Sequence, residues 1–268
     1  MEEGRNMTVI YVPKGKAREY SPLALNLYLQ CSHKCKYCYA PSAMQRKREN
    51  YFNIPSPRKN VLVNLEKEIK KKRPKEQVLL SFIGDVYCET EDENKTTTKA
   101  LEMLLENKAP VAILTKGGYR CLKDIELFKK FGDHIQLGAT LTFLDEAKSF
   151  EWEPGAASPN ERIETLKILH DENIKTFVSL EPVIEPAETL KLIEKTLEVD
   201  CVDIYKIGKI NNYGGIDKNI DWTEFLTKCL SILRPSGKQI YIKHDLRLAA
   251  PSVKLYGNEV LPDEHNAE

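Results

Sequence analysis

The most constraining feature of this 268-residue sequence is a regular alternation of short apolar runs with longer segments of helical spacing. The apolar runs are rich in β-branched and aromatic residues and have the length of buried strands. Such alternation favours successive βαβ units around a parallel sheet, which makes the expected fold class α/β. The predicted strands are residues 23–29, 77–83, 111–114, 135–141, 176–180, 202–207 and 239–242.

Between these runs, apolar residues recur three and four positions apart, as on one face of a helix. Two of the predicted helices carry starting signals. Ser158 can cap a helix that has Pro159 in its first turn and Glu161 as the carboxylate of a capping box, and Asp221 can cap the helix that follows it. The predicted helices are residues 61–71, 95–106, 122–131, 159–171, 187–197 and 222–233.

The length allows one large domain that buries its own core without disulfides. We predict an N-terminal extension over residues 1–20, an α/β barrel over residues 21–248 and an irregular tail over residues 249–268. The tail loses the periodicity of the preceding chain and carries Pro251, Gly257 and Pro262. Irregular chain ends of this kind are common in domains of this size.

Charge and hydropathy exclude some classes of protein. Lys and Arg total 40, equal to Asp and Glu at 40, so no basic excess supports general binding to nucleic acid. A nucleic-acid partner is therefore conceivable but unsupported by net charge. No run approaches the roughly 18 apolar residues that cross a bilayer, and the first residues lack a signal-peptide pattern. We expect a cytoplasmic protein with no membrane partner.

Three of the seven cysteines crowd into one short segment, at Cys31, Cys35 and Cys38. This segment follows the predicted strand 23–29, so the thiols fall in a loop at the carboxyl end of a strand, where α/β barrels place their sites. In a reducing compartment, clustered cysteines indicate metal or redox chemistry more often than disulfides. Three thiolates can hold three irons of a cubane cluster and leave the fourth iron to a small molecule.

The spacing of these cysteines, with Tyr37 before the last one, resembles the radical S-adenosylmethionine (SAM) superfamily. The resemblance implies a partial (β/α)6 barrel of the TIM type that binds a [4Fe–4S] cluster and SAM. In that family the cluster binds the methionine end of SAM and reduces it, and the resulting 5′-deoxyadenosyl radical abstracts hydrogen from a substrate. The protein supplies orientation and exclusion of water. The resemblance leaves the substrate and the reaction, lyase or transferase, unidentified.

Matches continue at the ends of the later strands in the order the superfamily has them. The resemblance implies SAM contacts by the glycine and acid of a polar turn, by a lysine that reaches the methionine carboxylate, by hydroxyls and a carboxylate near the ribose, and by backbone near the adenine. Each of these residues is also an ordinary turn, strand or surface residue. The candidate cofactor-binding residues are Tyr37, Gly84, Asp85, Lys116, Thr140, Thr142, Ser179, Glu181 and Ile207.

The stretch from Glu153 to Pro159, with Arg162, is similar to the spore photoproduct lyase subgroup. That resemblance implies repair of a thymine dimer in DNA as an alternative function. Enzymes of the subgroup return a hydrogen atom from a cysteine near the second strand. The equivalent position here has no thiol, and Cys88, a few residues further on, is the candidate catalytic replacement or a simple core residue.

The sequence also leads to a second alternative function and to one expected partner. A noncatalytic iron–sulfur or zinc protein is the second alternative, and zinc normally needs four ligands, of which His33 is the nearest candidate for the fourth. The superfamily resemblance also implies a low-potential electron donor such as flavodoxin or ferredoxin as a partner.

Overall fold

The computed structural model describes residues 8–211 and 213–260. Its centre is one sheet in which the strands follow each other in chain order. The first strand, β1, runs antiparallel to β2, and each later pair is parallel. The strands are β1 (Ile10–Tyr11), β2 (Leu23–Leu25), β3 (Val78–Leu80), β4 (Val111–Thr115), β5 (Ile135–Thr140), β6 (Lys175–Val183), β7 (Ile204–Lys209) and β8 (Gln239–Ile242).

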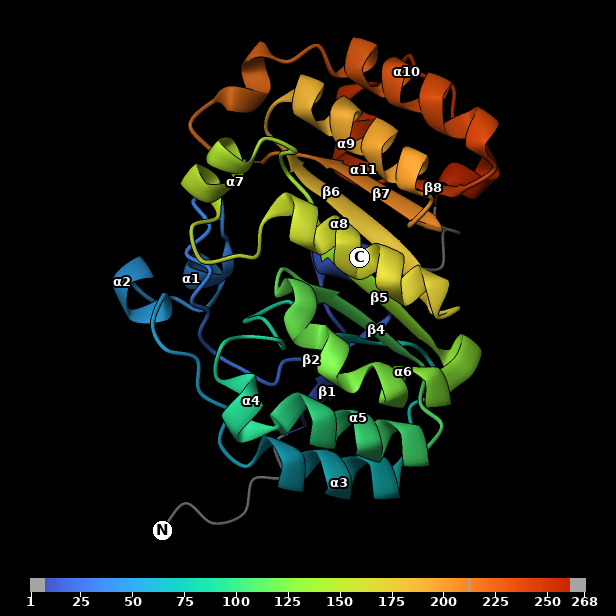
Figure 1. Cartoon of the computed structure of the whole chain (residues 1–268). Coiled ribbons are helices and arrows are strands. Elements are labelled where there is room, and N and C mark those ends of the chain that lie inside the picture. The colour runs from blue at the N-terminus through green and yellow to red at the C-terminus, as the bar shows by residue number, and fades with distance from the viewer. Residues whose placement is uncertain (1–7, 212, 261–268) are drawn as a thin grey trace.

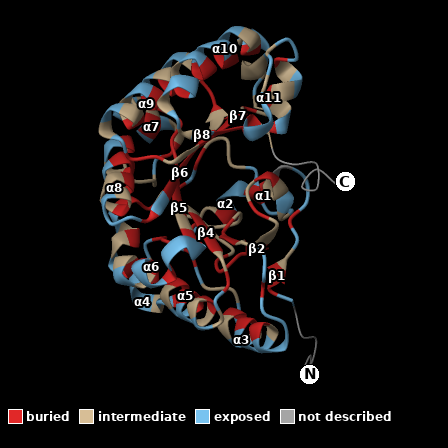
Figure 2. Cartoon of the chain, turned by 90° about the vertical axis from the view of Figure 1, so that its right-hand side faces the viewer, coloured by how far each residue is buried: buried red, intermediate tan, exposed pale blue. Residues whose placement is uncertain are grey.

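A helix follows each of the strands β2 to β7 and packs on the outside of the curved sheet. Figure 2 shows these helices as an outer arc with the strands on its inner side. Six strand–helix units form the sheet and its outer layer. Among the described residues no further strand pairs with the outer edge of β1 or of β8, so the barrel is partial, as the superfamily resemblance implies. The covering helices are α3 (Val61–Lys71), α5 (Thr96–Glu106), α6 (Ile125–Phe131), α8 (Pro159–Asp171), α9 (Pro186–Val199) and α10 (Trp222–Leu233).

The helix signals in the sequence have the expected geometry. The side chain of Ser158 accepts a hydrogen bond from the Glu161 amide at the start of α8, and that of Asp221 accepts one from the Glu224 amide at the start of α10. The predicted helix 122–131 is partly wrong, because residues 118–124 form the 3-10 helix η2 (Gly118–Asp124) and α6 begins only at Ile125.

Strands β2 and β3 end earlier than predicted. The Asn26 side chain explains the difference, because its Oδ1 atom accepts the amide hydrogens of Phe82 and Ile83, each at 3.1 Å. These amides therefore satisfy their hydrogen bonds outside the sheet, and the chain turns away after Leu80. Because β2 and β3 end early, a long loop follows each of them at its carboxyl end.

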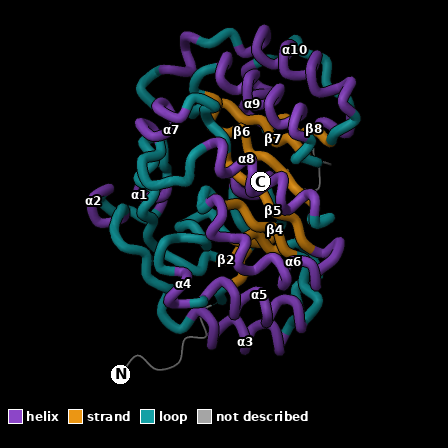
Figure 3. Tube along the Cα trace, in the orientation of Figure 1, coloured by secondary structure: helices purple, strands orange, loops and turns teal. Residues whose placement is uncertain are grey.

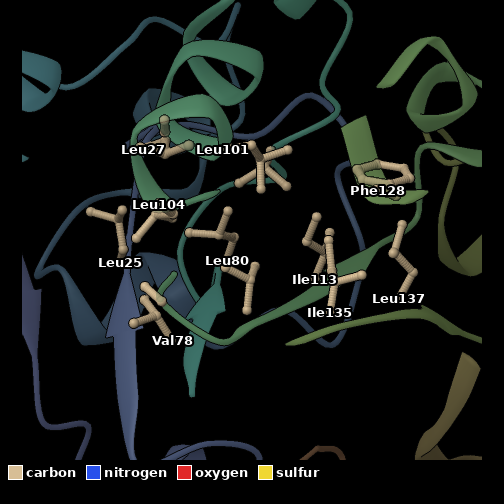
Figure 4. Packing of buried hydrophobic residues seen from close by; sticks show 14 of the residues in the cluster. Leu25, Leu27, Val78, Leu80, Leu101, Leu104, Ile113, Phe128, Ile135 and Leu137 are labelled. Atoms are coloured by element: carbon tan, nitrogen blue, oxygen red, sulfur yellow. The ribbon is translucent and has the colours of Figure 1, made fainter. Parts of the chain in front are cut away.

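Two apolar clusters lie between the sheet and its helices. Figure 4 shows part of the first, in which Leu80 and Ile113 from the strands face Leu101 and Leu104 of α5, with Phe128 of α6 nearby. The second joins β5–β8 with α8, α9 and α10. Burial of this apolar surface is the main source of stability and holds the strand ends in place.

Short helices and loops gather at the carboxyl ends of the strands. Figure 1 shows α1, α2 and α7 together on one side of the strands, and Figure 3 shows how much loop connects them. The sequence does not predict these short helices. They are α1 (Ala40–Ala43), α2 (Arg48–Tyr51), α4 (Glu91–Asn94), α7 (Glu146–Trp152) and, after β8, α11 (His244–Ala249).

The N-terminal segment includes the 3-10 helix η1 (Gly15–Glu19), and the chain after α11 includes η6 (Gly257–Glu259). Glu259 of η6 forms an ion pair with Arg234 at 2.8 Å. Residues 1–7 of the predicted extension and 261–268 of the predicted tail lie outside the described residues. Within the described part of the chain, none of the helices combines the length and the apolar character that crossing a bilayer requires.

Candidate functional site

The loop after β2 carries the three clustered cysteines. Cys35 is buried, Cys31 and Cys38 are half-buried, and all three thiols are free. Arg48 of α2 braces this loop, because its Nη2 atom donates to the carbonyl oxygens of Cys35 (2.8 Å) and Lys36 (3.1 Å), and its Nη1 atom donates to that of Cys38 (3.1 Å). These three hydrogen bonds tie the cysteine loop to α2.

A second segment, residues 152–155 at the end of α7, is hydrogen-bonded to the cysteine loop. The Lys36 amide donates to the Trp152 carbonyl at 2.8 Å, and the Gly155 amide donates to the His33 carbonyl at 3.0 Å. A Cβ atom built on Gly155 would lie 2.3 Å from the carbonyl oxygen of Ser32, closer than any real contact. Only glycine allows the two backbones to approach this closely.

We therefore expect Gly155→Ala to displace the cysteine loop. The overpacking should lower the free energy of unfolding by about 1–3 kcal/mol, and the shifted thiols should take up less iron during anaerobic reconstitution. Gly257→Ala is the matched control, because a Cβ atom there meets nothing within 4 Å. Equal iron uptake and stability in the two variants, measured by iron assay and urea denaturation, would contradict the close packing described here.

Burial controls the protonation of the three thiols. It raises the pKa of Cys35 to about 12 and also raises the pKa values of Cys31 and Cys38. Without metal, all three are therefore protonated at neutral pH. Since the thiolate is the form that binds metal, metal uptake at this loop must release protons.

A buried ion pair lies directly beneath the loop. Arg162 of α8 and Glu153 are almost wholly inaccessible to solvent, and Arg162 Nη2 lies 2.7 Å from Glu153 Oε2. Arg162 also donates to the Thr140 carbonyl at 2.6 Å, and the hydroxyl of Tyr37 donates to Glu153. The pair thus connects α8 and the end of β5 to the residue before the last clustered cysteine.

Lys116 follows β4 and lies beside the cysteine loop. Its ammonium nitrogen is 5.6 Å from the centre of the Tyr37 ring, and its carbonyl accepts the Ala157 amide at 3.0 Å. Burial alone would lower the pKa of Lys116, but the neighbouring Cys35 and Glu153 raise it overall. The side chain is therefore a permanent cation next to the thiols.

Asp85 is held by protein donors on both of its oxygens. Oδ1 accepts from the Thr115 hydroxyl (2.6 Å) and the Tyr87 amide (2.8 Å), and Oδ2 accepts from the Lys116 amide (2.7 Å). The His33 ring lies 3.5 Å away. Burial opposes ionisation, but His33 and these donors keep the pKa of Asp85 below its ordinary value. This carboxylate fixes the start of the loop that carries Lys116.

Two buried threonines lie at the end of β5 and just after it. Thr140 and Thr142 are both buried, at 4% and 1% exposure. The Oγ1 atom of Thr142 has no hydrogen-bond partner among the described residues, and neither does the Oγ atom of Ser32 in the cysteine loop. Buried hydroxyls without a partner are costly in a protein, which favours a bound polar group beside them.

Ser179 and Glu181, at the end of β6, belong to a second polar network. The Tyr20 hydroxyl donates to Glu181 Oε2 at 2.8 Å and lies 2.7 Å from Ser179 Oγ, and Lys243 donates to the same carboxylate. A Cβ atom on Gly208 would lie 2.9 Å from the Glu181 carboxyl and from the Lys243 stem, so glycine makes room for this pair.

Three further candidates occupy more ordinary positions. Gly84 has a φ of +74°, which favours glycine, and a Cβ there would lie 3.0 Å from Tyr28. Ile207 is fully buried in β7, and its carbonyl accepts the Lys243 amide at 2.9 Å. Cys88 is buried, and its sulfur lies 3.4 Å from the Thr90 hydroxyl. The roles of all three in binding or catalysis stay predictions.

The family model for the radical SAM superfamily matches residues 25–199, well over half of the chain. The chain belongs to the radical SAM superfamily. Members of this superfamily are enzymes that use a [4Fe–4S] cluster and SAM, and they need a reductant and a substrate. The matched region contains the cysteine loop, Asp85, Lys116 and Glu181.

Two relatives share the sequence over part of their length. An uncharacterised protein of Methanocaldococcus jannaschii is 33% identical over 162 residues, which cover 60% of this chain and 60% of the relative. An uncharacterised protein of Acidianus two-tailed virus is 26% identical over 207 residues, which cover 71% of this chain and 65% of the relative. The chain therefore spans less than two thirds of the length of these two relatives.

Solved structures confirm the predicted radical SAM barrel. SuiB of Streptococcus suis, bound to SAM, has a TM-score of 0.61 at 15% identity, with 87% of this chain and 53% of SuiB covered. A cysteine-to-serine mutant of spore photoproduct lyase has a TM-score of 0.59 at 13% identity, with 86% of this chain and 65% of the lyase covered. At these identities the likeness concerns the fold.

The cysteine loop offers the types of donor that the superfamily's cluster and cofactor require. Among the described residues, no three His, Cys, Asp or Glu side chains converge so closely that they could hold one ion. The three free thiols and the unsatisfied hydroxyls of Ser32 and Thr142 are consistent with an iron–sulfur cluster and a polar cofactor here.

Several residues of this radical SAM site were not proposed from the sequence as cofactor contacts. Arg48 braces the cysteine loop from a segment without a local signal, and Gly155 does so from the stretch 153–159, which the sequence singles out only for its resemblance to the spore photoproduct lyase subgroup. Lys243 directly follows β8, so the strand-end rule that found Lys116 could also have found it. Tyr20 comes from the predicted extension, and its position inside the barrel follows only from tertiary packing.

Proposed function

We propose that the chain holds a [4Fe–4S] cluster through Cys31, Cys35 and Cys38 and uses it in the reductive cleavage of SAM. One observation carries this proposal: three free thiols share one loop, which Arg48 and Gly155 brace at the carboxyl ends of the barrel strands. Three cysteine ligands leave one iron of a cubane for the amino and carboxylate groups of SAM.

When bound, the cluster supplies the electron that cleaves SAM to a 5′-deoxyadenosyl radical, which abstracts hydrogen from an organic substrate. The protein supplies binding and orientation. Lys116 offers a cation for the methionine carboxylate, and Thr142 offers a free hydroxyl for a polar group of the cofactor. The contacts of Asp85 with Thr115, Tyr87 and Lys116 favour a positioning role, in which it fixes the loop of Lys116.

Lys116→Met should weaken SAM binding while leaving the cluster intact. The loss of a charge-assisted hydrogen bond corresponds to roughly 10–100-fold in affinity. Lys36→Met is the matched control, because Lys36 also lies 5.6 Å from an aromatic ring in this region but pairs with Glu151 near the surface. Titration of SAM into both reconstituted variants measures the effect. An unchanged affinity in Lys116→Met would remove Lys116 from the binding site.

An acidic electron-transfer protein such as flavodoxin or ferredoxin is the proposed reductant. The segment 34–59 contains two of the clustered cysteines and the chain that follows them, and in it Glu49 is the only acidic residue. Lys34, Arg46 and Lys47 are exposed there. A basic patch of this kind steers an acidic partner toward the cluster. The basic residues of the segment are Lys34, Lys36, Arg46, Lys47, Arg48, Arg58 and Lys59.

Anaerobic reconstitution with iron and sulfide tests the proposed function. We expect a brown protein with the absorbance of a cubane cluster, and formation of 5′-deoxyadenosine when SAM and dithionite are added. A protein that holds one tightly bound zinc and forms no 5′-deoxyadenosine would instead be a noncatalytic metal protein. The assay needs no knowledge of the substrate, because abortive cleavage of SAM also yields this nucleoside.

A further inference from the structure

A cavity of about 580 Å³ lies at the amino ends of the strands, opposite the cysteine loop. Its wall includes residues just before β2, β3 and β8, among them Pro22, Gln77 and Lys238, together with Asn258 near η6. This volume lies within the range of pockets that hold small organic molecules. The proposed SAM chemistry uses the other end of the barrel, so this cavity needs a separate explanation.

Lys206 projects a buried cation into this cavity. The residue is 7% exposed and lines the cavity wall. Its ammonium forms no ion pair within the described chain, and its only hydrogen bond there is a long one, 3.4 Å to the Tyr20 carbonyl. The rings of Tyr20 and Phe177 lie 5.0 and 4.8 Å from it. Burial, and next the nearby Lys243, lower the pKa of Lys206 to about 8. An anion in the cavity would relieve this unpaired charge.

Arg18 provides a second incompletely satisfied cation in the same wall. Its Nε atom is buried without a hydrogen-bond partner in the described structure. Glu19 is the single carboxylate among the lining residues. Its Oε1 atom already accepts hydrogen bonds from the Tyr241 hydroxyl (2.6 Å) and the His244 amide (2.7 Å). Together with Lys238, which pairs with Asp200, the wall has three cations and one carboxylate.

We propose that this cavity binds a small phosphate-bearing molecule through Arg18 and Lys206. A guanidinium matches two phosphate oxygens at once, and an ammonium serves as a point charge for the third. The rest of the wall combines neutral polar side chains with apolar ones such as Ile204, Ile240 and Val260, which suits the remainder of an organic phosphate. These neutral polar side chains are Gln77, Gln136, Gln239 and Asn258.

Tyr20 separates the phosphate cavity from the candidate cofactor site. Its carbonyl contacts Lys206 on the cavity side, whereas its hydroxyl contacts Ser179 and Glu181 toward the carboxyl ends of the strands. A ligand in the cavity therefore cannot reach the cysteine loop directly. A ligand bound in this cavity would therefore be separate from the reacting substrate.

Isothermal titration of the full chain with inorganic pyrophosphate and with AMP tests the proposal, with and without a reconstituted cluster. We expect binding in both forms of the protein, and no displacement when SAM is present in excess. Lys206→Met and Arg18→Gln should each weaken binding by roughly 10–100-fold. Lys130→Met, which changes an exposed lysine of α6, should leave the affinity unchanged.

Thermal unfolding provides a second measurement that does not rely on titration. Lys206→Met should raise the Tm of the ligand-free protein, because it replaces a buried unpaired charge with an apolar chain of similar length. The same variant should lose the increase in Tm that pyrophosphate gives the unchanged protein. Absence of binding to the unchanged protein, displacement by SAM, or equal affinity in the Lys206 and Lys130 variants would each overturn the proposal. None of these results depends on the cluster or on cleavage of SAM.

Discussion

Cys35→Ala is expected to abolish the bound cluster and all formation of 5′-deoxyadenosine. Cys35 is the most buried of the three clustered thiols, at 6% exposure, and its carbonyl is held by Arg48. With one thiolate removed, two irons of the cubane lack a protein ligand, and the corner that binds SAM is no longer unique. Iron content, the brown absorbance and the nucleoside product, measured after anaerobic reconstitution, should all fall to background.

Cys229→Ala is the matched control for this experiment. Cys229 is also a buried free cysteine, but it lies on α10 in the apolar cluster beneath β7 and β8. Its loss should cost some stability and leave iron binding intact. If Cys35→Ala kept its full iron content while Cys229→Ala lost it, the cluster would be assigned to the wrong thiols.

Glu153→Ala should cause the largest loss of stability among the substitutions considered. It removes the partner of Arg162 and leaves a buried guanidinium uncompensated, which costs about 3–5 kcal/mol. The Tyr37 hydroxyl loses its acceptor in the same variant. The free energy of unfolding, measured by urea denaturation of the cluster-free protein under anaerobic reducing conditions, should fall by this amount.

Glu151→Ala provides the comparison, two residues away on the same segment. Glu151 pairs with Lys36 at 2.7 Å, but both side chains are well exposed, at 65% and 41%. Exposed pairs contribute about 0–1 kcal/mol. Similar losses in the two glutamate variants would show that the Glu153–Arg162 pair is not the link between α8 and the cysteine loop.

Local sequence signals sufficed for much of the fold. The caps at Ser158 and Asp221 and the apolar spacing of the helices gave α3, α8 and α10 their observed bounds, because these helices are determined by their own residues and by one buried face. Strand ends were less predictable. Strand β3 ends just before the Phe82 and Ile83 amides, which donate hydrogen bonds to the Asn26 side chain. This contact joins segments far apart in the chain.

The candidate site likewise combines residues that the sequence predicts with residues that it does not predict. The cysteine loop and Lys116 follow directly from motifs at strand ends. The residues that brace them do not, since Arg48, Gly155 and Glu153 act through contacts that only the folded chain brings together. Glu181 shows this limit of the sequence most clearly. Its sequence position indicates a ribose contact, whereas its hydrogen-bond partners in the fold are Tyr20 and Lys243. Its contact with SAM stays a prediction.

Electron paramagnetic resonance of the dithionite-reduced, anaerobically reconstituted protein tests the central claim most directly. If Cys31, Cys35 and Cys38 leave one iron open, addition of SAM should change the spectrum of the reduced cluster, because the nucleotide becomes a ligand of that iron. A protein that holds a full cubane cluster and gives the same spectrum with and without SAM would contradict the account.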